Sequence, residues 1–129
     1  MQHTDQKRNA RKRLETLIAG LRFKHTFIDA GAGNGELTGW VGRAFERTIA
    51  IEPNPFLRDQ LRLVCSKAEV LASTILDAKP AAKADFVLLS HVLYYIPATG
   101  WAANVERLAT FLSGTGELRA IPERWWRGA

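Results

Sequence analysis

The sequence predicts an α/β fold in which a mostly parallel sheet of about five strands is flanked by helices. Short apolar runs alternate along the 129 residues with segments of helical periodicity. The run at 84–90 is almost continuously apolar, as expected of a central parallel strand that is covered on both faces. Glycines at every second position follow the run at 25–29, and such a turn commonly joins a strand to a helix in parallel sheets.

The first half of the chain predicts two helices and two strands. We expect a helix over 5–21, a strand at 25–29, a helix over 35–45 and a strand at 47–52. Each helix should bury one apolar face against the sheet. The residues expected on these buried faces are Leu14, Leu17, Ile18, Leu21, Leu37, Trp40, Val41 and Ala44.

A proline-rich break separates the second strand from the next helix. Asn54 is expected to cap that helix, and Pro55 suits its first position because proline lacks the N–H that would be unpaired there. The apolar residues of this helix are Phe56, Leu57, Leu61 and Val64.

The second half predicts three further strands, at 68–72, 84–90 and 117–121. A helix over 99–112 separates the last two strands, and the Ser-Gly-Thr-Gly segment at 113–116 is expected to end it. The alternation of strands and helices places ligands at the carboxyl ends of the first two strands.

Composition favours a single domain over 1–129 in a reducing cytoplasm. No window approaches the apolar length of a membrane span, and no secretory signal follows Met1. The single cysteine, Cys65, excludes an intramolecular disulfide and is expected to be a small core residue, with no metal site around it.

The glycine turn reads Asp29-x-Gly31-x-Gly33-x-Gly35, and a second acid, Glu52, ends the following strand. Glycine permits positive φ and lets a ligand approach the backbone closely. A carboxylate only accepts hydrogen bonds, so Glu52 suits the two hydroxyls of a ribose. The two parts together predict a nucleoside-binding half-site.

This pattern differs from the dinucleotide spacing G-x-G-x-x-G and resembles motif I of the class I S-adenosylmethionine-dependent methyltransferases, whose acid after the second strand matches Glu52. Segments 85–96 and 112–118 are similar to the family's motifs around its fourth and fifth strands. The resemblance covers about 10–121. Ile51-Glu52-Pro53, with 93–96 and Trp101, most resembles the branch containing histamine N-methyltransferase.

The resemblance implies a Rossmann-like fold, S-adenosyl-L-methionine as cofactor, and methyl transfer to a nitrogen or oxygen of a small molecule. It implies cofactor contacts from Asp29, Gly31, Ala32, Gly33, Gly35, Glu52, Pro53, Ser73, Thr74, Ser90 and His91. Near the end of the fourth strand, His91, Tyr94 and Tyr95 are the candidate catalytic residues. His91 is a candidate base or a structural histidine, and the tyrosines are expected to form pocket walls.

The sequence departs from the family in two places. Many members carry an acid after the third strand that bonds the adenine amino group, whereas here Ser73 or Thr74 occupies that region and Asp77 follows late. The family usually adds two strands after the fifth, and here only the tail with Trp125 and Trp126 follows. We expect a fold lacking the last strands, with a homodimer or partner chain covering the exposed edge, or the tail packed on its own domain.

The net charge of +5 leaves a second reading of the first helix open. Its basic cluster is Lys7, Arg8, Arg11, Lys12 and Arg13. A solvated helix face is favoured over a nucleic-acid contact, because no aromatic residues interleave with the charges. A third option is that the helix closes over the cofactor.

The alternatives to a small-molecule enzyme are a non-catalytic cofactor-binding subunit and, less favoured, an RNA methyltransferase.

Overall fold

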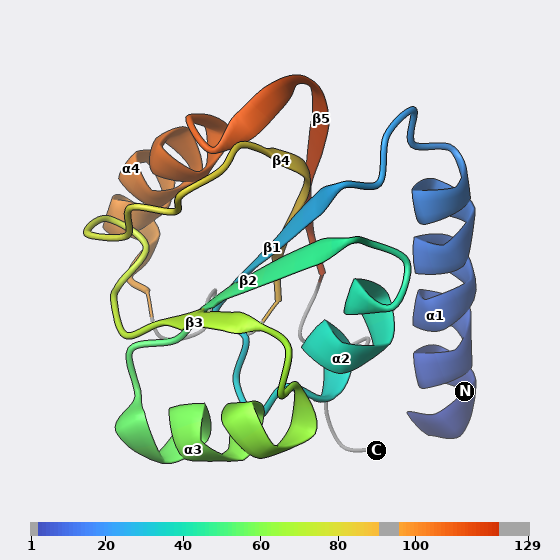
Figure 1. Cartoon of the computed structure of the whole chain (residues 1–129), viewed down its shortest axis with the longest axis horizontal. Coiled ribbons are helices and arrows are strands. Elements are labelled where there is room, and N and C mark those ends of the chain that lie inside the picture. Colours follow the sequence, from blue (N-terminus) through green and yellow to red (C-terminus); the bar gives the residue numbers. More distant parts are fainter. Residues whose placement is uncertain (1–2, 91–95, 122–129) are drawn as a thin grey trace.

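The computed structural model describes residues 3–90 and 96–121 and contains a five-stranded sheet flanked by helices (Figure 1). The strand order is β3-β2-β1-β4-β5, and every neighbouring pair is parallel. The Rossmann-like α/β class predicted from the sequence is therefore confirmed. The elements in chain order are α1 (His3–Ala19), β1 (Thr26–Ala30), α2 (Glu36–Gly42), β2 (Arg47–Ile51), α3 (Pro55–Val64), β3 (Glu69–Leu71), β4 (Ala84–Leu89), α4 (Ala98–Ala109) and β5 (Leu112–Ala120).

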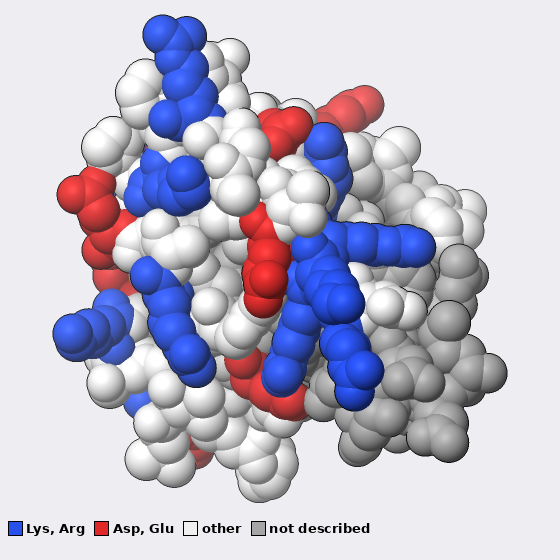
Figure 2. All heavy atoms as spheres, turned by 90° about the vertical axis from the view of Figure 1, so that its right-hand side faces the viewer, with Lys and Arg blue, Asp and Glu red and all other residues white. Residues whose placement is uncertain are grey.

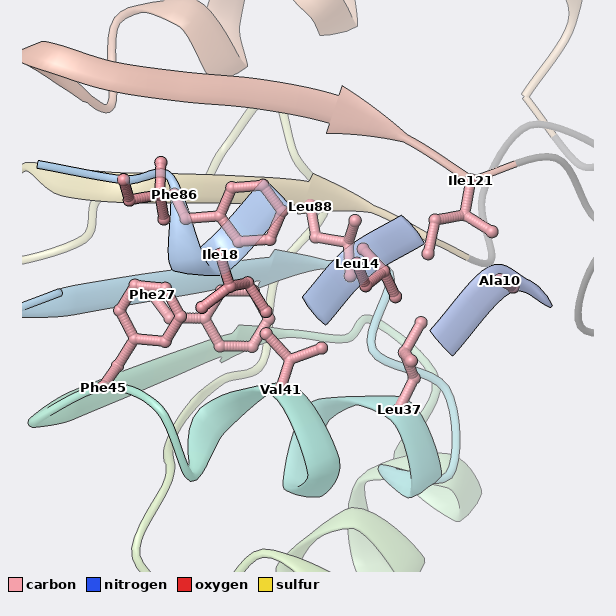
Figure 3. Packing of buried hydrophobic residues seen from close by; sticks show 11 residues of the cluster. Ala10, Leu14, Ile18, Phe27, Leu37, Val41, Phe45, Phe86, Leu88 and Ile121 are labelled. Atoms are coloured by element: carbon pink, nitrogen blue, oxygen red, sulfur yellow. The ribbon is translucent and has the colours of Figure 1, made fainter. Parts of the chain in front are cut away.

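Alternate residues of the strands point to opposite faces of the sheet and build two apolar layers. On one face, Phe27 of β1 and Phe86 of β4 stack with Phe45 under α1 and α2 (Figure 3). On the other face, Ile28 and Val87 pack with Leu108 of α4. Figure 1 shows α1 and α2 on one side of the sheet and α4 on the other. Both faces of the central strands are covered, which explains their continuous apolar sequence.

Helix α1 buries a narrow apolar stripe and exposes its charges. Ala10, Leu14 and Ile18 are buried on the side of α1 that faces the core, at the helical spacing. In Figure 2 many Lys and Arg side chains gather on the side of the molecule that carries α1. The exposed basic residues of this helix are Arg8, Arg11, Lys12 and Arg13. Among them, the Arg11 guanidinium lies over the Trp40 ring of α2, with Cζ 5.8 Å from the ring centre.

The Asn54 cap lies as predicted, whereas the predicted burial of Ala44 is wrong. Asn54 Oδ1 accepts from Phe56 N at 2.9 Å and from Leu57 N at 3.2 Å. Phe56 and Val64 are exposed because only Leu61 of α3 faces the sheet directly. Ala44 is also exposed, because α2 ends at Gly42, before a fourth buried position is reached.

The segment 113–116 is not the turn that its glycines predict. It lies inside β5, where the register against β4 jumps from Ala84↔Leu112 to Phe86↔Glu117. A Cβ on Gly116 would lie 2.5 Å from the carbonyl oxygen of Ala84. Gly116 therefore allows the close backbone approach at an irregular strand pairing, and the helix ends earlier, at Ala109.

The amino ends of β1 and β4 are joined by one buried carboxylate. Asp85 Oδ2 accepts from the backbone N–H groups of His25 at 2.9 Å and Thr26 at 3.0 Å. The His25 imidazole projects outward and donates from Nδ1 to the carboxylate of Glu46. Among the described residues, no helix is long and apolar enough to cross a membrane.

His25 provides a pH prediction. The hydrogen bond to Glu46 raises the pKa of His25 above its ordinary value, and the charge of Glu46 adds to the effect. Because the raised pKa belongs to the folded state, this contribution to stability is fully present below the ordinary pKa of about 6.5. It is lost as pH rises through the folded-state pKa. In an NMR titration, His25 should titrate above free histidine, and Glu46→Gln should lower its pKa. An unchanged pKa in the variant would contradict the pairing.

Candidate functional site

The turn between β1 and α2 depends on glycine. Gly31, Gly33 and Gly35 have φ angles of 72°, 61° and 90°. These lie in the left-handed region that residues with a side chain rarely adopt. The N–H groups of Gly31 and Ala32 donate to the Ile51 carbonyl at 2.9 and 3.1 Å, which ties the turn to the end of β2.

Glu52 joins the glycine turn to the start of α3. Its side chain is buried, with 1% of the residue exposed. Oε1 accepts from Gly33 N at 2.8 Å, and Oε2 accepts from Asn54 N at 3.0 Å. Pro53, which lies between Glu52 and Asn54 in the sequence, is exposed. The structure thus brings Glu52, Pro53 and the glycines together. The Glu52 carboxylate holds the turn in place by accepting from the backbone N–H of Gly33.

Asp29 lies fully buried at the end of β1 and connects three segments. Its Oδ2 accepts from Thr38 Oγ1 of α2 at 2.7 Å, and its Oδ1 accepts from Ser90 Oγ at 2.8 Å. The Ser90 hydroxyl also lies 3.2 Å from the Gly31 carbonyl oxygen. Asp29, Ser90 and the turn therefore form one cluster, and the cofactor contacts predicted for them stay predictions.

Two contributors were missed by the sequence reasoning. Thr38 is fully buried, and its only sequence signal is a polar residue between the apolar positions Leu37 and Val41 of α2. Arg58 donates from Nη1 to the carbonyls of Glu52 at 3.1 Å and Pro53 at 2.6 Å. It fixes the path of the chain out of β2, and nothing in its position along the sequence indicates this contact.

The far side of the turn packs against α3. A Cβ on Gly35 would lie 2.8 Å from Leu61 Cδ1 and 3.2 Å from Cys65 Sγ. The Cys65 thiol donates to the Gly35 carbonyl at 3.2 Å, and burial raises its pKa. Cys65 is therefore a half-buried packing residue at the end of α3 rather than a reactive thiol.

Ser73 and Thr74 follow β3 but bond locally. Ser73 Oγ donates to the Thr74 carbonyl at 2.7 Å, and Thr74 Oγ1 lies 3.2 Å from an oxygen of Asp77. The Glu52 N–H donates to the carbonyl of Leu71, so the segment begins beside the site. Neither hydroxyl bonds to the glycine turn within the part of the chain that the structure describes. Their predicted contact with adenine stays a prediction.

The predicted catalytic residues His91, Tyr94 and Tyr95 lie outside the described residues. Ser90, which precedes them, marks where the chain leaves β4 beside Asp29. On the other side of the gap, Trp101 Nε1 donates to the carbonyl of Ile96 at 2.7 Å. The roles of the three residues therefore stay predictions.

The arrangement suits a cationic ligand that carries hydroxyl groups. Two carboxylates lie at the carboxyl ends of adjacent strands, and the partners described above are N–H and O–H groups rather than cations. These described N–H and O–H donors fix the orientation of both carboxylates beside the turn. A carboxylate offers about four lone pairs, so each oxygen of Glu52 retains capacity for a further donor.

Comparison with known proteins gives the family. The family described as "Methyltransferase domain" matches residues 1–118. No curated protein sequence matches the chain.

Solved structures of methyltransferases share the fold. The N-methyltransferase NodS from Bradyrhizobium japonicum WM9 superposes with a TM-score of 0.79 at 18% identity, covering 90% of this chain and 67% of that one. CalS10 from Micromonospora echinaspora, an amino pentose methyltransferase solved with SAM bound, gives 0.79 at 17%, covering 91% and 50%. The sugar N-methyltransferase KedS8 from Streptoalloteichus sp ATCC 53650 gives 0.76 at 18%, covering 86% and 46%. The chain thus spans about half to two thirds of the length of these proteins.

Gly35→Ala should destabilise the protein by about 1–3 kcal/mol. The residue has φ of 90°, and the new methyl group would meet Leu61. Gly114→Ala is the matched control, because nothing lies within 4 Å of the added carbon. Chemical denaturation of both variants measures the difference. Equal stability of the two variants would contradict the turn geometry.

Glu52→Gln should lower the free energy of unfolding by about 1–3 kcal/mol. The glutamine amide has one oxygen, so one of the N–H groups of Gly33 and Asn54 would face an NH₂ group. Glu106→Gln, at an exposed position of α4, should change stability by less than about 0.5 kcal/mol. If urea denaturation gives the same free energy of unfolding for Glu52→Gln and Glu106→Gln, the Glu52 carboxylate does not hold the turn.

Proposed function

This chain belongs to the methyltransferase domain family, and from that premise we propose that it binds S-adenosyl-L-methionine and transfers the methyl group to a nitrogen or oxygen of a small molecule. The observation that carries the proposal is the pair of buried carboxylates, Asp29 and Glu52, on either side of a turn with three positive-φ glycines. Among proteins of similar structure, NodS is an N-methyltransferase and KedS8 is a sugar N-methyltransferase, which supports a small-molecule acceptor.

The residues present fit this cofactor. S-adenosylmethionine carries a sulfonium and an ammonium group, and the two acids beside the turn, Asp29 and Glu52, favour a positively charged ligand there. Glu52 can accept from ribose hydroxyls through the lone pairs that its two backbone donors leave free. The backbone at Gly31 and Gly33 carries no side chain that would hold a ligand away.

When bound, the cofactor would supply a methyl group on sulfur that a nucleophile can displace. The work of the chain is then to hold the ligand in one orientation and to exclude water. Asp29 keeps α2 and Ser90 against the turn, and Glu52 fixes the turn to β2 and α3. We assign Ser73 and Thr74 to the adenine side, and His91, Tyr94 and Tyr95, next after Ser90, to the acceptor side.

The location and the assembly of the protein also belong to this proposal. The single cysteine supports a reducing cytoplasm. In the described sheet β5 is an edge strand, which supports its pairing with a partner chain or a second copy.

The cofactor contact is best tested by changing the ligand and the protein together. Wild-type protein should bind S-adenosylhomocysteine in roughly the micromolar range by calorimetry. An analogue without the ribose hydroxyls should bind about tenfold to a hundredfold more weakly. In Glu52→Gln this penalty should shrink, because a neutral amide accepts a weaker hydrogen bond than a carboxylate. Measuring both ligands with both proteins completes a thermodynamic cycle, which separates recognition of the ribose from a general loosening of the turn.

Glu106→Gln is the control and should reproduce the wild-type penalty. If removal of the ribose hydroxyls weakens binding equally in the wild type and in Glu52→Gln, Glu52 does not contact the ribose. Absence of binding to the wild type would overturn the cofactor proposal. Incubation with labelled S-adenosylmethionine and a panel of small amines and alcohols separates an enzyme from a binding module, since only an enzyme releases S-adenosylhomocysteine.

A further inference from the structure

A basic cleft lies at the opposite end of the sheet from the glycine turn. It has a volume of about 470 Å³ and lies between the loop that enters β4 and the end of α4. Its lining includes Lys79, Lys83, Arg107, Thr110 and Phe111. Because the strands are parallel, the start of β4 and the end of β1 lie at opposite ends of the sheet. In Figure 1 the loop before β4 and the helix α4 lie on the same side of the molecule.

The three cations of the cleft, Lys79, Lys83 and Arg107, form no salt bridge with any acid among the described residues. Lys83 Nζ donates to the Thr110 carbonyl, and Arg107 Nη2 donates to the Ala78 carbonyl at 2.7 Å. The elements on both sides of the cleft therefore contribute positive charge to one small volume.

Arg107 also carries a donor that its surroundings do not use. Its guanidinium lies over the Phe111 ring, with Cζ 5.3 Å from the ring centre. The Nε–H is shielded from solvent and has no hydrogen-bond partner among the described residues. Such a donor is uncommon in folded proteins, because a buried N–H without a partner is unfavourable. The position of Lys83 is explained by the carboxyl end of α4, where a cation offsets the negative end of the helix dipole. This role explains neither the position of Lys79 nor the buried Nε–H of Arg107.

We propose that this cleft binds a small molecule bearing a diphosphate group. A diphosphate carries about three negative charges near neutral pH and matches the three cations, whereas a single carboxylate would offset only one. The volume falls within the range of small-ligand sites, roughly 300–1,000 Å³. Binding turns the Arg107 guanidinium so that Nε–H reaches the anion, and arginine is suited to phosphate because its donors form a planar fork. The inference is independent of the proposed methyl transfer.

The test is calorimetric titration of the full chain with sodium pyrophosphate at constant ionic strength. The wild type should bind. Lys79→Gln should bind about tenfold more weakly, as should Arg107→Met, which keeps an unbranched side chain near Phe111 and loses the charge. Lys67→Gln is the matched control, since Lys67 is an exposed lysine outside the cleft and should leave binding unchanged.

Absence of pyrophosphate binding to the wild type would overturn the proposal. Equal weakening in Lys67→Gln and Lys79→Gln would also overturn it, because that result indicates diffuse attraction to a basic protein. Lys79 is exposed, so Lys79→Gln keeps the test decisive even if Arg107→Met fails to fold. Titration with S-adenosylhomocysteine should give the same affinity in Lys79→Gln and the wild type, which separates this site from the glycine turn.

Discussion

The candidate site depends on the carboxylate of Glu52, which holds the backbone of Gly33 on one oxygen and that of Asn54 on the other. Because β2 positions Glu52, the turn after β1 and the start of α3 are both fixed relative to the sheet. Asn54 then caps α3, whose Leu61 packs against Gly35 on the far side of the same turn. One buried side chain thereby couples two loops and a helix, so the turn is shaped before any ligand arrives.

Asp29 complements Glu52 from the neighbouring strand. Its partners are the hydroxyls of Thr38 and Ser90, one from α2 and one from the segment that leaves β4. The two acids are thus held by dipoles from four different segments, in an interior where electrostatic interactions are stronger than in water. The described contacts thus fix the orientation of both carboxylates beside the glycine turn.

Local sequence rules predicted the strands, the glycine turn and the Asn54 cap, because each depends on residues a few positions apart. They failed where a distant group decides the outcome. The glycines at 114 and 116 resembled a turn, yet Gly116 is required by the Ala84 carbonyl, which belongs to another strand. Thr38 was missed because its role exists only once α2 packs on β1. Arg58 was missed for another reason: its partners are the nearby carbonyls of Glu52 and Pro53, and no residue pattern indicates a side chain that folds back onto them. Phe56 and Val64 satisfied helical periodicity, but α3 buries too narrow a stripe to cover them.

The two ends of a parallel sheet present different unpaired groups, and the acids of this protein follow that difference. At the amino ends, strands leave N–H groups free, so Asp85 is satisfied directly by His25 and Thr26. At the carboxyl ends, strands leave carbonyls, which cannot bond to a carboxylate. Donors for Asp29 and Glu52 therefore come from other segments: the hydroxyls of Thr38 and Ser90 and the N–H groups of Gly33 and Asn54. The lone pairs of Glu52 beyond its two backbone donors suit a ligand that donates, in agreement with the nucleoside site proposed at this end of the sheet.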